Sequence, residues 1–251
     1  MLLDDRTAVI YGGGGAIGGA VARAFAREGA TVHLAGRTPA TLDAVAEEIR
    51  AAGGRADTAR VDALDERAVD EHADAVATTG GGIDISFNAI SHNFVHGTPM
   101  AEMALDDFAG EIATMVRTTF LTARAAARHM IPRSSGVILA FGGSGDPLRD
   151  YYIGGTQVAF EAIEQMRRQL SAELGRHGIR VVTLRTGGVP ESLPEGFEGR
   201  EKIVESIVSP TMLGRAATLE DVGNVAAFVA SDRARTLTAA AVNISCGALI
   251  D

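Results

Sequence analysis

The residues best suited to chemistry lie near the start of the chain, where a run of apolar residues meets a cluster of glycines. Residues 9–18 read V-I-Y-G-G-G-G-A-I-G. A glycine-rich turn between a strand and a helix presents free backbone N–H groups at the positive end of the helix dipole, and a pyrophosphate group needs both. The pattern predicts a dinucleotide site, and the residues expected to form it are Gly12, Gly14, Gly15, Ala16, Ile17 and Gly18.

A basic residue follows the second expected strand. A site that prefers NAD(H) usually carries Asp or Glu there, which binds the ribose 2′-hydroxyl. This chain instead has Arg37, followed by Thr38. A guanidinium group suits a 2′-phosphate and can stack on an adenine face, so Arg37 favours NADP(H) over NAD(H). The alternative interpretation is a solvated arginine that caps the next helix.

Strand-like and helix-like segments alternate along the whole chain, which predicts parallel βαβ units in a doubly wound α/β fold. A chain of 251 residues suits one large domain better than two. The expected strands are residues 8–11, 31–36, 58–61, 83–88, 137–141, 180–184 and 241–244. The expected helices are residues 17–28, 39–49, 66–79, 109–130, 156–176 and a last one to residue 231 that Thr218 caps.

Two other segments are punctuated by glycine or proline. Residues 80–82 are three glycines, which we interpret as a helix-to-strand turn rather than a second binding loop. Residues 190–210 contain three prolines and many charges, and they are the least regular stretch of the chain. We predict a flexible substrate flap there, within a single domain that spans residues 1–251.

Charge and cysteine content exclude several classes of partner. The net charge of −9 argues against nucleic acid or an anionic membrane. The single cysteine cannot form an internal disulfide, and it fits a reducing cytoplasm. We expect neither a secretory signal nor a membrane span. The chain has no clustered Cys/His pattern, so no metal site is expected.

With these features the chain resembles the short-chain dehydrogenase/reductase family over essentially its whole length. The matching segments, besides the glycine turn, are residues 36–37, 61–63, 178–181, 213–221, 228–231 and 243–247. Residues 88–91 stand where the family has N-N-A-G and keep only the first asparagine, and residues 186–187 read T-G where the family has P-G. The resemblance implies a Rossmann fold with a seven-stranded parallel sheet, a nicotinamide cofactor, a small-molecule substrate and self-association into a dimer or tetramer. The further cofactor contacts that it implies are Asp62, Ala63, Asn88, Ala89, Thr186 and Gly187.

The same resemblance shows that the usual catalytic residues are missing. The family uses asparagine, serine, tyrosine and lysine, and counting from its landmarks places these four on Met115, Gly143, Thr156 and Phe160. No register shift restores the pair, because no tyrosine here has a lysine four residues later. The tyrosine is a general acid with an ordinary pKa near 10, which a neighbouring cation lowers. Without such a pair we expect a rate loss of about 10²–10⁴, unless another group substitutes.

The segment after the fifth strand offers substitutes. Ser144 lies one residue beyond the expected serine, and Tyr152 lies about one helical turn before Thr156. We predict these two as catalytic candidates, although Tyr151 and Tyr152 can equally pack the loop onto the sheet. His92 and His96 follow the Asn88 strand end, where ligand-proximal loops lie, and Arg185 is a candidate cation near the nicotinamide.

Three functions remain open at this point. The first is an atypical NADP(H)-dependent oxidoreductase that transfers hydride to or from a small carbonyl, enone, imine or alcohol. The second is a catalytically inactive nucleotide-binding partner or sensor, which the four missing groups favour. The third is a non-redox lyase, isomerase or cyclase on the same scaffold.

Overall fold

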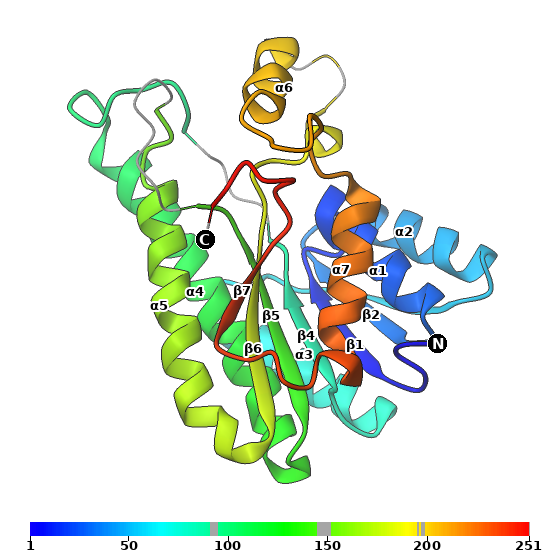
Figure 1. The fold of residues 1–251 in the computed structure, drawn as a ribbon. Helices are drawn as coiled ribbons and strands as arrows, with labels where there is room; N and C mark the ends of the chain where they lie inside the picture. The colour runs from blue at the N-terminus through cyan, green and yellow to red at the C-terminus, as the bar shows by residue number, and fades with distance from the viewer. Residues whose placement is uncertain (91–94, 145–151, 195, 197–198, 251) are drawn as a thin grey trace.

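A single sheet of seven parallel strands organises the molecule in the computed structural model (Figure 1). The structure describes residues 1–90, 95–144, 152–194, 196 and 199–250. The strand order is β3-β2-β1-β4-β5-β6-β7. The strands are β1 (Thr7–Tyr11), β2 (Thr31–Gly36), β3 (Arg55–Arg60), β4 (Ile85–Asn88), β5 (Gly136–Gly142), β6 (Ile179–Arg185) and β7 (Ala240–Asn243). The predicted Rossmann-type fold is therefore confirmed.

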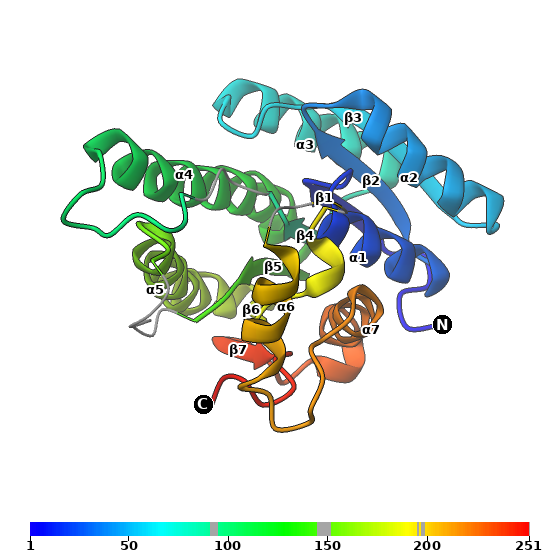
Figure 2. The ribbon, with the colours of Figure 1, turned by 90° about the horizontal axis from the view of Figure 1, so that it is seen from above.

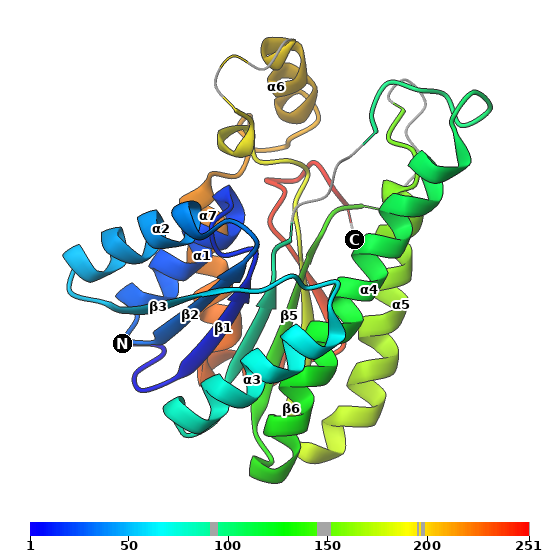
Figure 3. The ribbon, with the colours of Figure 1, turned by 180° about the vertical axis from the view of Figure 1, so that it is seen from behind.

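Helices cover both faces of this sheet (Figure 2). Helices α1 (Ala16–Arg27), α2 (Pro39–Ala51) and α7 (Leu219–Ala230) pack on one face. Helices α3 (Glu66–Gly80), α4 (Leu105–Met130) and α5 (Thr156–Leu174) pack on the other face, which Figure 3 shows from its own side. The short helix α6 (Arg200–Val208) stands apart from both layers, beyond the ends of the strands (Figure 1).

Burial explains the strand pattern. Strand β1 reads T-A-V-I-Y and is buried at every position, because helices cover it on both sides. Strand β3 lies at the sheet edge and reads R-A-D-T-A-R, with only Ala56 buried. The sequence placed this strand at residues 58–61, three residues too late, because an edge strand needs no continuous apolar run.

Small residues let the helices that carry the glycine turn pack closely. A Cβ atom on Gly223 of α7 would lie 2.9 Å from the Cβ atom of Ala24 on α1. Thr218 caps α7 as predicted, since its side chain accepts from the N–H of Asp221 and the Asp221 carboxylate accepts from the N–H of Thr218. These contacts hold α1, and with it the turn that precedes α1.

Helix α4 is fixed against α3 by charged side chains. Arg124 donates to Glu66 at 2.6 Å and to Asp70 at 2.8 Å, while the ring of His129 lies 2.8 Å from Asp74. Exposed pairs of this kind add little stability individually. Their effect is to set which face of α4 points toward the sheet.

Two helix predictions need correction. Helix α4 begins at Leu105 rather than at residue 109, and its N-cap, Ala104, makes no side-chain capping bond that could have marked the start. Residues 190–210 contain the helix α6, which the prediction of an irregular flap did not include. The side chain of Ile207 supports α6, since it packs where a Cβ atom on Gly188 would otherwise lie. The glycines at 80–82 form the predicted turn, with Gly81 as the left-handed cap of α3.

Candidate functional site

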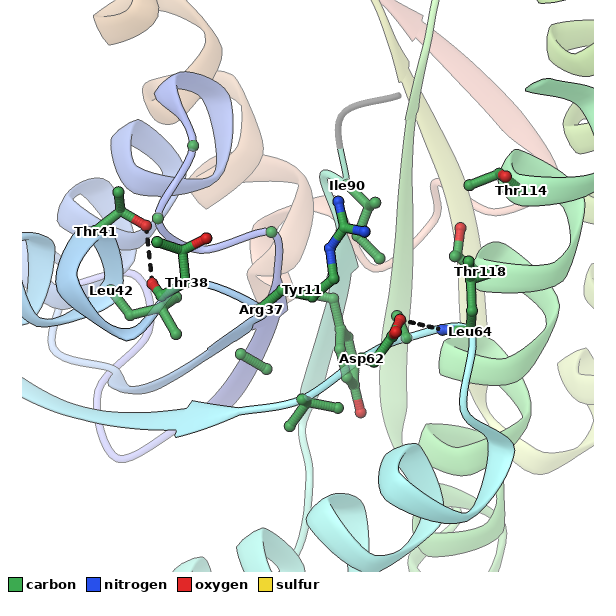
Figure 4. Close-up of a pocket in the computed structure, with 17 residues that line it drawn as sticks. Tyr11, Arg37, Thr38, Thr41, Leu42, Asp62, Leu64, Ile90, Thr114 and Thr118 are labelled. Carbon is green, nitrogen blue, oxygen red and sulfur yellow. Dashed lines mark hydrogen bonds between the residues drawn. The ribbon is translucent and has the colours of Figure 1, made fainter. Parts of the chain in front are cut away.

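A cleft of about 240 Å³ opens at the carboxyl ends of β1 and β2 and reaches across to α4 (Figure 4). Ligands of doubly wound sheets bind in this position, where the strand order reverses direction. Its lining consists of Tyr11, Gly12, Gly14, Gly15, Ala35, Gly36, Arg37, Thr38, Thr41, Leu42, Val61, Asp62, Ala63, Leu64, Ile90, Thr114 and Thr118. Seven of the predicted cofactor residues are among them: Gly12, Gly14, Gly15, Arg37, Thr38, Asp62 and Ala63.

The glycine turn leaves no space for side chains. Gly12 has φ +78°, and a Cβ atom there would lie 2.5 Å from the carbonyl oxygen of Ala89. A Cβ atom on Gly18 would collide with the carbonyl oxygen of Gly12. These glycines therefore allow the turn to pack against the strand ends. Gly15 is the least crowded of these positions, since a Cβ atom there would lie 3.3 Å from the Gly12 oxygen.

The first turn of α1 presents unused hydrogen-bond donors. Its N-cap is Gly15, in extended conformation and without a side-chain capping bond. Within the described part of the chain, the backbone N–H groups of Ala16, Ile17 and Gly18 have no acceptor. Free N–H groups at a helix N-terminus bind phosphate oxygens, so the residues present here fit the pyrophosphate of a dinucleotide.

Arg37 and Asp62 provide opposite charges on the two sides of the cleft (Figure 4). Arg37 is exposed, and it makes no hydrogen bond or ion pair with the residues that the structure describes. Its guanidinium group is thus available to a ligand. Asp62 accepts a hydrogen bond from the N–H of Leu64 at 3.0 Å through Oδ1, which orients the carboxylate. Its other oxygen remains available to a ligand donor.

Other predicted cofactor residues support the cleft from outside its lining. Asn88 accepts from the N–H of Ile90 at 3.0 Å and donates to Thr122 at 3.3 Å, which fixes the turn after β4. Ala89 lies against Gly12. Thr186 donates its N–H to the carbonyl oxygen of Gly142 at 3.2 Å, and Gly187 approaches Ala248. A direct cofactor contact for these residues stays a prediction.

Sequence reasoning missed the part of the cleft that α4 provides. Thr114 and Thr118 line the cleft, and their spacing of four residues puts them on one side of the helix. It also missed Tyr11, whose pKa is raised by burial and further by the charge of Asp70, so its hydroxyl stays protonated. Two threonines on a long helix are a weak sequence signal for a binding site, because threonine is also common on helix surfaces of other kinds.

The four positions that the resemblance assigned to catalysis lie close together and are mostly apolar. Met115 is 3 % exposed and belongs to one apolar cluster with Ala140, Ala159, Ile163 and Phe160. The Phe160 ring lies over Gly143, so that a Cβ atom there would come within 2.7 Å of it. At three of the four positions the structure therefore has apolar packing of Met115 and Phe160 around Gly143, and the assignment of these positions to catalysis stays a prediction.

A polar pair occupies the fourth position. The Thr156 hydroxyl donates to Oε1 of Glu111 at 2.6 Å, and these residues are only 3 % and 5 % exposed. Burial raises the pKa of the Glu111 carboxyl, although hydrogen bonds from Thr156 and from the Gly155 backbone oppose the shift. Sequence reasoning did not single out Glu111, because a glutamate in a helix is usually exposed.

A second buried glutamate shows what a neighbouring cation does. Glu164 on α5 accepts from Arg167 at 2.8 Å. Burial alone would raise its pKa, but the hydrogen bond and the charge of Arg167 outweigh burial, and the pKa is lowered. The two glutamates are buried alike and shifted in opposite directions, since only Glu164 has an arginine partner.

The predicted substitutes for the catalytic groups are placed outside the cleft lining. Tyr152 is 46 % exposed, and its carbonyl oxygen accepts from the N–H of Gly97 at 2.8 Å. Ser144 follows β5 directly and is half-buried. Their catalytic roles stay predictions, as does that of His96, whereas His92 and Tyr151 lie outside the described residues. The described ranges contain no group of three His, Cys, Asp or Glu side chains able to hold a metal ion.

Comparison with known proteins agrees with this architecture. A family model described as enoyl-(acyl carrier protein) reductase matches residues 14–248. The chain belongs to the short-chain dehydrogenase/reductase family. The meso-2,3-butanediol dehydrogenase of Serratia marcescens is 30 % identical to it, over 99 % of this chain and 96 % of that protein. The gluconate 5-dehydrogenase of Gluconobacter oxydans is 28 % identical, over 91 % of this chain and 89 % of that protein.

Solved structures of the family superpose closely on this chain. A short-chain type dehydrogenase/reductase from Mycobacterium marinum gives a TM-score of 0.87 at 27 % identity, covering 99 % of this chain and 97 % of that one. Family membership supports a general oxidoreductase role with a nicotinamide cofactor and a small-molecule substrate. Among the described residues, none of the helices is both long and apolar enough to cross a membrane.

Proposed function

We propose that this member of the short-chain dehydrogenase/reductase family is an NADP(H)-dependent oxidoreductase with a non-standard proton donor. Its substrate would be a small carbonyl, enone or imine, or the corresponding alcohol. The observation that carries the cofactor preference is Arg37, which is exposed and has no partner among the described residues at the mouth of the cleft. A 2′-phosphate would give this guanidinium group a partner.

Different residues of the cleft would bind different parts of the dinucleotide. The open first turn of α1 would hold the pyrophosphate, Arg37 the 2′-phosphate, and the free oxygen of Asp62 the adenine amino group. A bound nicotinamide would supply or accept the hydride, which is chemistry that belongs to the cofactor. The apolar cluster of Met115 and Phe160 would exclude water from the reacting end.

Calorimetric titration with NADPH and then NADH tests the cofactor preference. We expect the wild type to bind NADPH in the micromolar range and NADH more weakly. Arg37→Glu should weaken NADPH binding about 10–100-fold, because a charge-assisted hydrogen bond of about 1.5–3 kcal/mol is lost. Arg168→Ala, an exposed arginine on α5, is the matched control. Equal loss of NADPH and NADH binding in Arg37→Glu would contradict a role in selecting the 2′-phosphate.

A second candidate is an inactive nucleotide-binding partner or sensor, which the apolar packing of Met115, Gly143 and Phe160 favours. Single-turnover oxidation of NADPH by any carbonyl, enone or imine would exclude it. Tight NADPH binding without turnover of such a panel would support it over the oxidoreductase.

We further propose a dimer or tetramer in the cytoplasm. Phe120 on α4 and Val158 on α5 are 47 % and 46 % exposed, and apolar side chains on two adjacent helices suit a contact between copies. Light scattering on the purified protein measures the assembly.

The segment at 190–210, including α6, would act as the substrate flap, and deleting it should raise KM for substrate without changing NADPH affinity.

A further inference from the structure

The first turns of α4 carry one buried carboxylate, which lies next to the cleft-lining part of the helix without being part of the lining itself. Thr114 lines the cleft, and Glu111 lies three residues before it, or about one turn closer to the helix start. Glu111, Met115 and Thr118 recur at spacings of four and three, so they share the face of α4 that is turned inward. Glu111 therefore lies at the carboxyl edge of the sheet, beyond Met115 and beside the start of α5.

Its carboxyl group accepts hydrogen bonds from Thr156 and from the Gly155 backbone, and one of its oxygens is unused. Oε1 accepts the Thr156 hydrogen bond at 2.6 Å. Oε2 is buried and has no hydrogen-bond partner among the described residues. Leaving a carboxylate oxygen unpaired in a buried position is costly, whereas the carbonyl oxygen of a protonated carboxyl carries no formal charge and costs less to bury. An unpaired buried oxygen is also what a bound water or a polar ligand group would satisfy.

No charged side chain within the described residues opposes the neutral form. On α4 the nearest acidic groups are Asp106 and Asp107, and in the segment at 95–104 the titratable groups are Glu102 and His96; all four are exposed. The first turn of α5 has no acidic residue, and Glu161 beyond it is exposed. The causes that act on the pKa of Glu111 are burial and two hydrogen bonds, and no charged neighbour among the described residues contributes.

We propose that Glu111 holds the proton for this site and delivers it to the substrate oxygen through the Thr156 hydroxyl; the inference rests on the proposed oxidoreductase function. In the reducing direction the carbonyl carbon receives a hydride from the dihydronicotinamide, and the C=O π bond breaks. With the acid proton on Oε1 of Glu111, the 2.6 Å hydrogen bond to Thr156 is used in the reverse direction, from the carboxyl to the hydroxyl oxygen. The substrate oxygen then takes the Thr156 proton while the Thr156 oxygen takes the proton of Oε1. The products are the alcohol and the oxidised nicotinamide, and the Glu111 carboxylate regains a proton from water.

The missing lysine then has a physical reason. A tyrosine begins near pKa 10 and needs a cation to lower it, whereas a glutamate begins near 4.5 and needs an apolar site without a cation to raise it. A lysine at residue 160 would stabilise the ionised form of Glu111, and an ionised carboxylate cannot act as an acid. Phe160 and Met115 provide the apolar surroundings instead. The loss of both the tyrosine and the lysine is therefore consistent with a single change, in which a glutamate takes the place of a tyrosine as the acid.

Glu111→Gln, which retains an acceptor for Thr156, is the decisive variant. It should bind NADPH within threefold of wild type and lose about 10²–10⁴-fold in turnover of a panel of ketones, enones and imines. Glu161→Gln, an exposed glutamate on α5, is the matched control. Thr156→Val should lose turnover as well, and Thr156→Ser should restore it because the hydroxyl returns.

Infrared spectroscopy gives a readout that does not depend on turnover. The carbonyl stretch of a protonated carboxyl should persist in the wild type above the pH range of ordinary glutamates, and Glu111→Gln should remove it. The pH profile of kcat/KM should fall with the same apparent pKa. A wild type without this band, or a Glu111→Gln variant with wild-type turnover, would overturn the inference. Failure of the wild type to bind NADPH would instead overturn the proposed function.

Discussion

The cleft around the glycine turn and the cluster around Phe160 lie at the same edge of one sheet, yet the chain contributes different groups to each. In the cleft, the binding groups are backbone N–H donors of α1 and one guanidinium group without a described partner. In the cluster, the places of the family's polar side chains are filled by Met115, Gly143 and Phe160, which pack on each other.

The difference reflects how each site depends on the fold. A phosphate site made of backbone groups requires the strand, the turn and the helix, so it persists as long as the glycines do. A proton-transfer site made of side chains can be exchanged residue by residue without disturbing the fold. Burial also shifts one titratable group in each region toward its neutral form: it lowers the pKa of His72 near the cleft and raises that of Glu111 near the cluster.

The largest effect on stability and on NADPH binding should come from a change in the glycine turn. Gly12→Ala forces a side chain into a left-handed conformation and against Ala89, so it should destabilise the fold by about 3 kcal/mol or more and abolish NADPH binding. Gly53→Ala is the control, since Gly53 has φ +84° but nothing within 4 Å. It should lose only about 1–2 kcal/mol. Urea unfolding and calorimetry measure both; similar losses would mean that close packing at Gly12 is unimportant.

Acid should next weaken the region around the cleft. Burial, aided by the charge of His33, lowers the pKa of His72 from 6.5 to about 4. Between pH 6.5 and 4, His72 therefore binds a proton in the unfolded chain but not in the folded chain. The free energy of unfolding has its full value above pH 6.5 and falls as the pH drops toward 4. The loss should reach up to about 3 kcal/mol.

Thermal unfolding across this pH range measures the effect of His72. His72→Phe keeps an aromatic ring beside Tyr11, which His72 meets edge-on at 5.9 Å between centroids, and should flatten the acid limb of the curve. His177→Gln serves as the control on a distant 3-10 turn. An unchanged curve in His72→Phe would assign the acid sensitivity to other groups.

The smallest effect on stability, and the most specific one, should come from the cluster. Phe160→Lys should cost about 1–2 kcal/mol of stability because apolar contacts are lost. It should also return the pKa of Glu111 toward its ordinary value, since a cation favours the carboxylate. Phe160→Leu, with a similar loss of packing, should leave that pKa raised. Infrared titration of both variants would show whether the charge, rather than the packing, controls Glu111.

Much of the fold was predictable because local patterns agree with the tertiary structure. The second strand follows from the alternation of strand-like and helix-like segments along the chain. The start of α7 follows from the capping chemistry of Thr218, and the turn at residues 80–82 follows from its glycines. The predicted boundaries failed where a local signal is weak: at the polar edge strand β3, at the uncapped start of α4 and in the short helix α6. At β3, pairing with β2 along the whole strand compensates for the weak strand propensity.

The sequence by itself determined the parallel sheet, the position of the glycine turn and the absence of the tyrosine and lysine, because each follows from residue type and spacing along the chain. Only the tertiary structure decided that Arg37 faces a cleft together with Asp62, that α4 contributes Thr114 and Thr118, and that Glu111 meets Thr156. Arg37 and Asp62 are 25 positions apart, Thr118 lies 56 positions beyond Asp62, and Glu111 and Thr156 are 45 positions apart. Burial and hydrogen bonding between such distant segments change a pKa or create a cleft, and no local pattern encodes them.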